Sequence, residues 1–161
     1  MQKIIGAIAI ALLVCACSSI DCPIQNTVYT TYKIYNKVEK VDTLRDTLTV
    51  YSKRVEGTDS VFINKDIKVT NFSLPISYMA DADTLVFEFK NVKSIILKDT
   101  VTVSKTNTPH FESVDCSPSY FHNLTGVKYT KNKIDSIVIK NTTVSYDASK
   151  EHFHIYLKSD N

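Results

Sequence analysis

One stretch of the chain decides the class of fold: Asp83-Thr84-Leu85-Val86-Phe87-Glu88-Phe89-Lys90. Its larger apolar residues, Leu85, Phe87 and Phe89, occupy every second position. Side chains of an extended backbone point to alternate sides, so these three share one face and the residues between them take the other. This period of two predicts a strand with Leu85, Phe87 and Phe89 in the core.

The same period recurs along the chain with almost no competing helical period. Other apolar sets that share a face are Val28, Tyr32 and Ile34; Leu48 and Val50; Ile137 and Ile139; and Phe153, Ile155 and Leu157. Roughly eight to ten such strands predict an all-β protein, an antiparallel β-sandwich. A partly open β-barrel is the alternative.

A recurring tripeptide marks most of the expected strand entrances. Asp followed by Thr or Ser and a branched apolar residue occurs six times, with the hydroxyl residues Thr43, Thr47, Ser60, Thr84, Thr100 and Ser136. Asp can cap a turn, and the residues after it favour extended backbone. Residues 129–134, which contain Asn132, are expected to form a hairpin tip.

The first residues form an export signal. Lys3 precedes the uncharged run Ile4 to Val14, which is too short to span a bilayer of about 30 Å. The following sequence, Val14-Cys15-Ala16-Cys17-Ser18, resembles the lipobox of bacterial lipoproteins. The resemblance implies that Cys17 becomes the lipid-bearing first residue of the mature chain. An ordinary secretory signal and an uncleaved anchor are the alternatives.

These features divide the chain into a signal peptide (1–16), a lipidated tether (17–25) and one β-sandwich domain (26–161). Removing sixteen of 161 residues leaves 145, which is enough for a single core. No second apolar stretch of about 18 residues follows, so the lipid is the expected membrane attachment.

Charge and composition disfavour several function classes. Without Lys3 the 19 basic side chains become 18, against 17 acidic ones, and they are interspersed, which argues against nucleic-acid binding. The mature part has two glycines, Gly57 and Gly126, too few for a phosphate-binding loop. No spacing singles out a nucleophile with its base. We therefore expect no enzyme activity and no cofactor.

Two cysteines, Cys22 and Cys116, remain after cleavage and lipidation. An oxidising compartment favours a disulfide between them, which stabilises by about 2–4 kcal/mol. Two unpaired, buried thiols are the alternative.

A metal site is a further candidate. His152 and His154 lie two residues apart, on one face of an expected strand, and can chelate zinc or copper with help from His110, His122 or a carboxylate. The polar face of an edge strand explains the pair equally well.

Several segments carry a resemblance to a known family. They are Phe72-Ser73-Leu74-Pro75, Asp83-Thr84-Leu85, Asn107-Thr108-Pro109-His110-Phe111, Asp115-Cys116, Phe121-His122 and Ile134-Asp135-Ser136-Ile137. From about Cys22 to Tyr156 the chain resembles Bacteroidetes lipoproteins of unknown function. The resemblance implies outer-membrane residence, on the periplasmic or the surface face. It also implies O-glycosylation, because the tripeptide is similar to the sequon of that lineage, with the six hydroxyl residues above as acceptors.

These features together predict a lipid-anchored, non-catalytic module of the cell envelope that binds a protein partner. Glycan or small-ligand binding is the first alternative, because nine tyrosines without tryptophan could form a stacking surface. A metal-binding protein that uses His152 and His154 is the second.

Overall fold

The computed structural model describes residues 27–54 and 57–158, in which ten strands and no helix occur. Residues 1–16, which are expected to form the signal peptide, and the cysteines Cys17 and Cys22 lie outside the described residues. The strands are β1 (Tyr29–Tyr35), β2 (Thr47–Ser52), β3 (Ser60–Asp66), β4 (Asn71–Pro75), β5 (Ala82–Lys90), β6 (Ile96–His110), β7 (Ser119–Tyr129), β8 (Ile134–Ile139), β9 (Thr143–Val144) and β10 (Phe153–Leu157).

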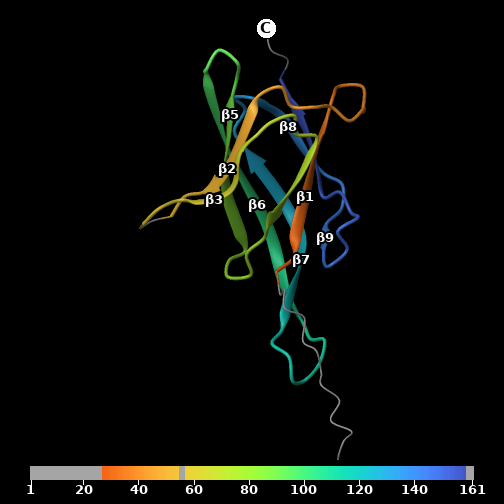
Figure 1. The fold of residues 1–161 in the computed structure, drawn as a ribbon. Coiled ribbons are helices and arrows are strands. Elements are labelled where there is room, and N and C mark those ends of the chain that lie inside the picture. Colours follow the sequence, from red (N-terminus) through yellow and green to blue (C-terminus); the bar gives the residue numbers. More distant parts are fainter. Residues whose placement is uncertain (1–26, 55–56, 159–161) are drawn as a thin grey trace, which may run out of the picture.

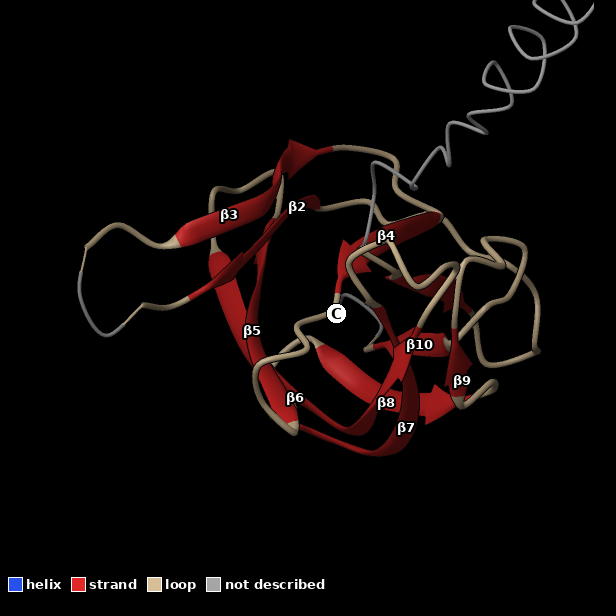
Figure 2. Cartoon of the chain, turned by 90° about the horizontal axis from the view of Figure 1, so that it is seen from below, coloured by secondary structure: helices blue, strands red, loops and turns tan. Residues whose placement is uncertain are grey.

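The strands form two sheets around one interior (Figures 1 and 2). The smaller sheet has the order β4-β1-β10-β8, and the larger one, β3-β2-β5-β6-β7-β9, curls into half a barrel (Figure 2). The expected all-β fold is confirmed, and it combines the sandwich with the partly open barrel. One pair departs from an antiparallel arrangement, because β1 and β10 pair in parallel, with Tyr32 opposite Phe153.

The core contains the residues that the alternation predicts. Leu85, Phe87 and Phe89 are all buried, and Tyr32 is stacked between Phe72 and Phe153 at centroid distances of 5.1 and 4.6 Å. The edge of Phe87 meets the Tyr32 ring at 5.8 Å, so this cluster joins the two sheets. Aromatic pairs of this kind contribute about 0.5–1.5 kcal/mol each beyond the burial of their area.

The turn after β7 differs from the expected hairpin. It leads from β7 in the larger sheet to β8 in the smaller sheet, so it crosses between sheets. The buried carboxylate of Asp99 holds it: Oδ1 accepts from Thr130 Oγ1 and Asn132 N at 2.7 Å, and Oδ2 accepts from the backbone N of Lys133 and Ile134 at 2.8 Å. A sequence pattern cannot distinguish this corner from a hairpin, since both need a tight polar turn.

The sandwich has two ends, which carry different sets of loops. At the near end the described chain begins, because the start of β1 pairs with the end of β4, Tyr29 opposite Pro75. Loop 76–81 and the projecting hairpin of β6 and β7 belong to this end, which is the lower one in Figure 1. At the far end lie loops 36–46, 67–70, 91–95 and 130–133.

Candidate functional site

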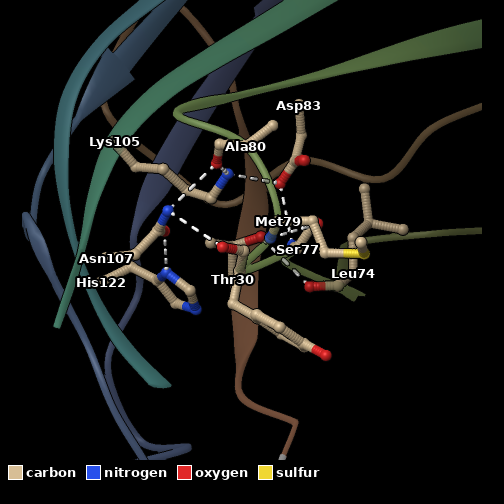
Figure 3. A network of polar contacts seen from close by, with 10 residues as sticks. Thr30, Leu74, Ser77, Met79, Ala80, Asp83, Lys105, Asn107 and His122 are labelled. Atoms are coloured by element: carbon tan, nitrogen blue, oxygen red, sulfur yellow. Dashed lines mark hydrogen bonds and ion pairs between the residues drawn. The ribbon is translucent and has the colours of Figure 1, made fainter. Parts of the chain in front are cut away.

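A buried lysine organises the polar groups of the near end (Figure 3). The side chain of Lys105, on β6, is 0% exposed. Its Nζ donates to the carbonyl oxygen of Ala80 at 2.7 Å and lies 3.1 Å from Oδ2 of Asp83. A buried ammonium is costly unless it is paired and hydrogen-bonded. Lys105 has both kinds of partner, so the fold accommodates its charge.

The same network fastens loop 76–81 to the sheet (Figure 3). Oδ2 of Asp83 accepts from the backbone N of Ser77 at 3.0 Å. Asn107 Nδ2 donates to the carbonyl oxygens of Tyr78 and Ala80, both at 3.2 Å. These bonds hold the loop through its backbone, while the side chains of Tyr78 and Met79 are 56% and 85% exposed.

His122, on β7, supports Asn107 from the opposite side. Its Nδ1 lies 2.7 Å from Oδ1 of Asn107 (Figure 3), so the ring donates to that oxygen. Burial, followed by the positive charge of Lys105, lowers the pKa of His122 to about 4. The ring is therefore neutral at pH 7, and its role in this network is to orient Asn107.

An open cleft lies beside the network. Its volume is about 730 Å³, and Asp83 and Thr84 of β5 line it together with Phe62, Pro75, Ile76 and Ser77. The walls are largely apolar, and Oδ2 of Asp83 is already bound to Lys105 and Ser77. The cleft therefore offers shape and apolar contact more than a reactive group.

The hairpin of β6 and β7 ends in residues 111–118, which we call the tip. Phe111 and Val114 at the tip are 61% and 98% exposed. At its base Tyr78 stacks on Tyr120 at a centroid distance of 4.6 Å, and His110 stacks on Phe121 at 4.2 Å. The near end thus presents aromatic and aliphatic side chains on a braced hairpin.

The far end carries two clefts that share Arg45, Lys133 and Lys158. Their volumes are about 240 and 520 Å³. Lys133 pairs with the buried Asp46 at 3.0 Å, so a second ion pair underlies this surface. Exposed aliphatic side chains line the larger cleft beside Lys93, namely Val92, Ile95 and Leu97. The far end therefore combines apolar area with positive charge.

A third polar cluster covers the outer face of the smaller sheet. The carboxylate of Glu151 accepts from Lys33 Nζ at 2.5 Å and from the Tyr35 hydroxyl at 2.9 Å, and lies 3.0 Å from Nε2 of His154. The hydrogen bond from Lys33 holds the pKa of Glu151 below its usual range. Tyr35 stacks on His154 at a centroid distance of 4.0 Å, with Tyr156 beside it.

His154 lies in β10, whereas His152 precedes the strand, and contacts within the fold engage the rings of both. His152 Nδ1 accepts from the backbone N of Thr31 at 3.0 Å, and its Nε2 donates to the carbonyl oxygen of Thr143 at 3.2 Å. Both nitrogens of His152 are thus occupied, and burial lowers its pKa. Nδ1 of His154 is buried without a hydrogen-bond partner among the described residues.

The other histidines do not complete a metal site around this pair. His122 belongs to the Lys105 network, and His110 lies 3.1 Å from Glu112 beside the tip. Within residues 27–54 and 57–158, no group of three or more His, Cys, Asp or Glu side chains is arranged to hold a metal ion. The metal hypothesis therefore has no support from this geometry.

The hydroxyl residues of the repeated tripeptide are all at least partly accessible. Thr43, Thr84 and Thr100 are exposed, whereas Thr47, Ser60 and Ser136 are half-buried. Thr47 and Ser60 begin strands β2 and β3, and Thr84 and Ser136 are the third residues of β5 and β8. The strand-entry prediction is wrong for Thr100, which lies inside β6, and for Thr43, which lies between β1 and β2. Glycosylation at these positions stays a prediction.

Cys116 lies in the tip and is buried. Because Cys22 lies outside the described residues, the pairing of Cys22 with Cys116 also stays a prediction. The described part of the chain contains no helix long and apolar enough to cross a membrane.

A search for known motifs misses two buried charged residues of β6. Asp99 and Lys105 occupy inward positions of β6, in series with the buried Val101 and Val103. Their signal in the sequence is a charged residue at a position where the alternation demands an apolar one. Such a residue indicates a buried ion pair, as at Lys105, or a capped turn, as at Asp99.

Comparison with known proteins gives one match. No curated protein and no solved structure matches the chain significantly. A profile described as "Family of unknown function (DUF6452)" matches residues 47–157, from β2 to the last residue of β10. The matched segment contains the Lys105 network, the tip and the apolar side chains of the larger far-end cleft, whose Arg45, Asp46 and Lys158 lie just outside it. The match covers more than half of the chain, which therefore belongs to this family of unknown function.

Proposed function

We propose that the chain is a lipid-anchored protein of the cell envelope that binds a protein partner at the far end of its sandwich, without catalysis. The anchor is supported by the lipobox-like residues 14–18. The proposed residence is the outer membrane, with the domain on its periplasmic or its surface face. Family membership does not assign a role, so the proposal depends on the geometry of the domain.

One observation carries the proposal: the cleft of about 520 Å³ at the far end. Val92, Ile95 and Leu97, which line it, are 94%, 53% and 40% exposed. Exposed apolar side chains that lie together mark an interaction site, whereas single scattered ones are normal on a protein surface. Arg45, Lys93 and Lys158 form a positive rim around them. An apolar centre with a charged rim fits a protein segment that carries aliphatic and acidic side chains.

The position of the cleft agrees with an anchored protein. The described chain begins at the near end, and Cys17 precedes that point by only ten residues. The far end is opposite (Figure 1), so it faces away from the membrane when the near end is anchored. A partner in the surrounding compartment can therefore reach the cleft without contacting lipid.

The absence of catalysis is inferred from the bonding of the buried polar groups. Lys105 and Asp83 neutralise each other, His122 is neutral, and His152 is bonded at both ring nitrogens. Asp99 accepts four hydrogen bonds from one turn. Asp99 and His152 thus use both polar atoms of their side chains to hold the fold, and Asp83 uses Oδ2 in the same way.

Site-specific photo-crosslinking in the native host tests the far-end cleft. A benzophenone amino acid replaces Val92, and the matched control position is Val138, which is 43% exposed on the outer face of the smaller sheet. We expect one discrete crosslinked product from position 92 and none from position 138. Lys93→Glu should weaken the product, because it removes a positive charge from the rim. Equal crosslinking at both positions would contradict the proposal.

The anchor has its own test. Cells grown with an alkyne analogue of palmitate should label the protein, and Cys17→Ala should abolish the label. The matched control is Cys22→Ala, which removes a neighbouring cysteine and should leave labelling intact. Labelling that persists in Cys17→Ala would remove the proposed anchor.

Glycan binding is a second candidate, and the Glu151 cluster favours it. Tyr35 and Tyr156 are half-buried on the outer face of the smaller sheet, beside a carboxylate that holds three donors. Aromatic faces next to such polar groups suit sugar rings. A glycan array should show binding that Tyr35→Ala removes, whereas an array without signal would leave the protein partner as the better function.

A further inference from the structure

The near end presents several exposed apolar side chains. Phe111 and Val114 are at the tip, and loop 76–81 adds Tyr78 and Met79 at its base. The loop is not free to fold inward, because Asn107 and the buried Lys105 hold its backbone (Figure 3). Tyr78 and Met79 are therefore held in an exposed position, and Phe111 and Val114 are exposed beside them at the tip. Something outside the described residues must cover these four side chains if they are to leave water.

The place where the chain enters the domain indicates what covers them. Tyr29 pairs with Pro75 at the near end, and loop 76–81 follows Pro75 directly. Residues 17–26 number ten, so Cys17 lies at most about 35 Å from Thr27. The hairpin projects from this same end of the domain (Figure 1), by the six residues of β6 beyond Ser104, or about 20 Å. A lipid on Cys17 thus lies within reach of the tip.

We propose that the tip docks onto the bilayer that holds the lipid anchor, with Phe111 and Val114 inserted into its interfacial region. This inference depends on the lipid anchor of the proposed function. Tyrosine suits the headgroup level, because its ring is apolar and its hydroxyl is polar, and Tyr78 has the matching position at the base of the tip. Docking adds a second attachment to the acyl chains and fixes the orientation of the domain.

The charges of the tip specify the kind of lipid surface. Residues 111–118 contain the acidic Glu112 and Asp115 and no lysine or arginine. Anionic headgroups therefore repel the tip, and the attraction is apolar. We expect docking onto zwitterionic phosphatidylcholine that weakens as phosphatidylglycerol is added. An electrostatically recruited surface would show the opposite dependence.

The predicted disulfide strengthens this geometry. Cys116 lies in the tip, so a bond to Cys22 attaches the tether to the tip itself. Only four residues then lie between the lipid-bearing Cys17 and the cysteine bonded to the hairpin, a reach of about 18 Å.

Tryptophan reporters test the docking, because the natural chain contains no tryptophan. V114W carries the reporter at the tip, and V92W is the matched control at the far end, where the natural side chain is 94% exposed. The full-length lipidated protein is incorporated into phosphatidylcholine liposomes with or without bromine on the acyl chains. We expect quenching of V114W at least about threefold stronger than that of V92W, because an interfacial group lies within about 5–10 Å of the acyl boundary.

Liposome flotation separates the two proposals. A chain that floats but shows equal quenching for V114W and V92W keeps its anchor and overturns the docking. A chain that does not float overturns the anchor, and the docking with it. Protection of the V114W reporter from aqueous iodide without quenching by brominated lipid would show that a second copy of the chain covers the tip, and would also overturn the docking.

Discussion

The buried pair of Lys105 and Asp83 makes a prediction whose size follows from its unequal burial. The lysine side chain is 0% exposed, whereas that of Asp83 is 19% exposed. Removing one member of a buried ion pair costs about 3–5 kcal/mol, because it leaves the other charge uncompensated. Lys105→Met leaves a carboxylate that water can reach, so we expect the lower value, about 3 kcal/mol.

Asp83→Ala should cost more, about 4–5 kcal/mol, because it leaves an ammonium that is fully enclosed and also removes the acceptor for Ser77 N. The double variant removes both charges and should therefore be more stable than the sum of the two single losses implies. We expect a coupling energy of at least about 2 kcal/mol between the two positions.

Urea unfolding of the lipid-free mature protein measures these values, with unchanged slopes as the check on two-state behaviour. A matched control is Lys98→Met, because the Lys98 ion pair with Glu88 is largely exposed and should contribute less than about 1 kcal/mol. Additive losses in the double variant, with a coupling below about 0.5 kcal/mol, would refute the view that the pair fastens loop 76–81.

Three further predictions concern single groups. Asp99→Ala should lower the free energy of unfolding by about 3 kcal/mol, because four donors of the turn after β7 lose a charged acceptor. A loss below about 1 kcal/mol in urea unfolding would contradict this expectation. Cys22→Ser and Cys116→Ser should each lower the free energy of unfolding by about 2–4 kcal/mol. Reductant should lower the stability of the natural protein to that of the variants. Mass spectrometry that shows two alkylated thiols without reductant would exclude the disulfide. The pKa of His122 is about 4 in the folded state, below its unfolded value of about 6.5. The neutral ring therefore makes its full contribution to the free energy of unfolding above about pH 6.5. This contribution is lost as the pH falls from about 6.5 to about 4. The unfolding free energies of the natural protein and His122→Gln should therefore converge across that window, whereas parallel pH profiles would contradict the lowered pKa.

The alternation of apolar residues was sufficient to predict the fold class, the positions of β1, β2, β5, β8 and β10, and about half of the core. Leu85, Phe87 and Phe89 are buried as expected, and Phe153 and Ile155 line the interior of β10. Val86 is also buried, although it points to the other side of β5. A period of two identifies faces, but it does not tell which outer face is covered by its neighbours.

Long-range pairing could not be predicted from local pattern. β1 and β10 stand near opposite ends of the chain and pair in parallel, which follows from the topology of the two sheets. The consequence for the candidate metal pair is direct. Pairing with β1 brings the backbone N of Thr31 to His152, and this bond decides that the histidine supports the fold. The spacing of His152 and His154 carried no information about β1.

The two ends of the molecule are connected by one continuous strand, and this connection has a functional consequence. β6 contains 15 residues, or about 50 Å of chain, and holds Asp99 toward the far end and Lys105 and Asn107 toward the near end. The described residues contain no helix or second domain between the ends that could act as a hinge. Under the two proposals, docking of the tip therefore sets the direction of the far-end cleft. V114D should release the tip from the bilayer, so that the domain takes a wider range of orientations, without altering Val92 or Lys93. We therefore expect it to lower the efficiency of crosslinking from position 92. The affinity of the purified domain for the same partner should stay constant.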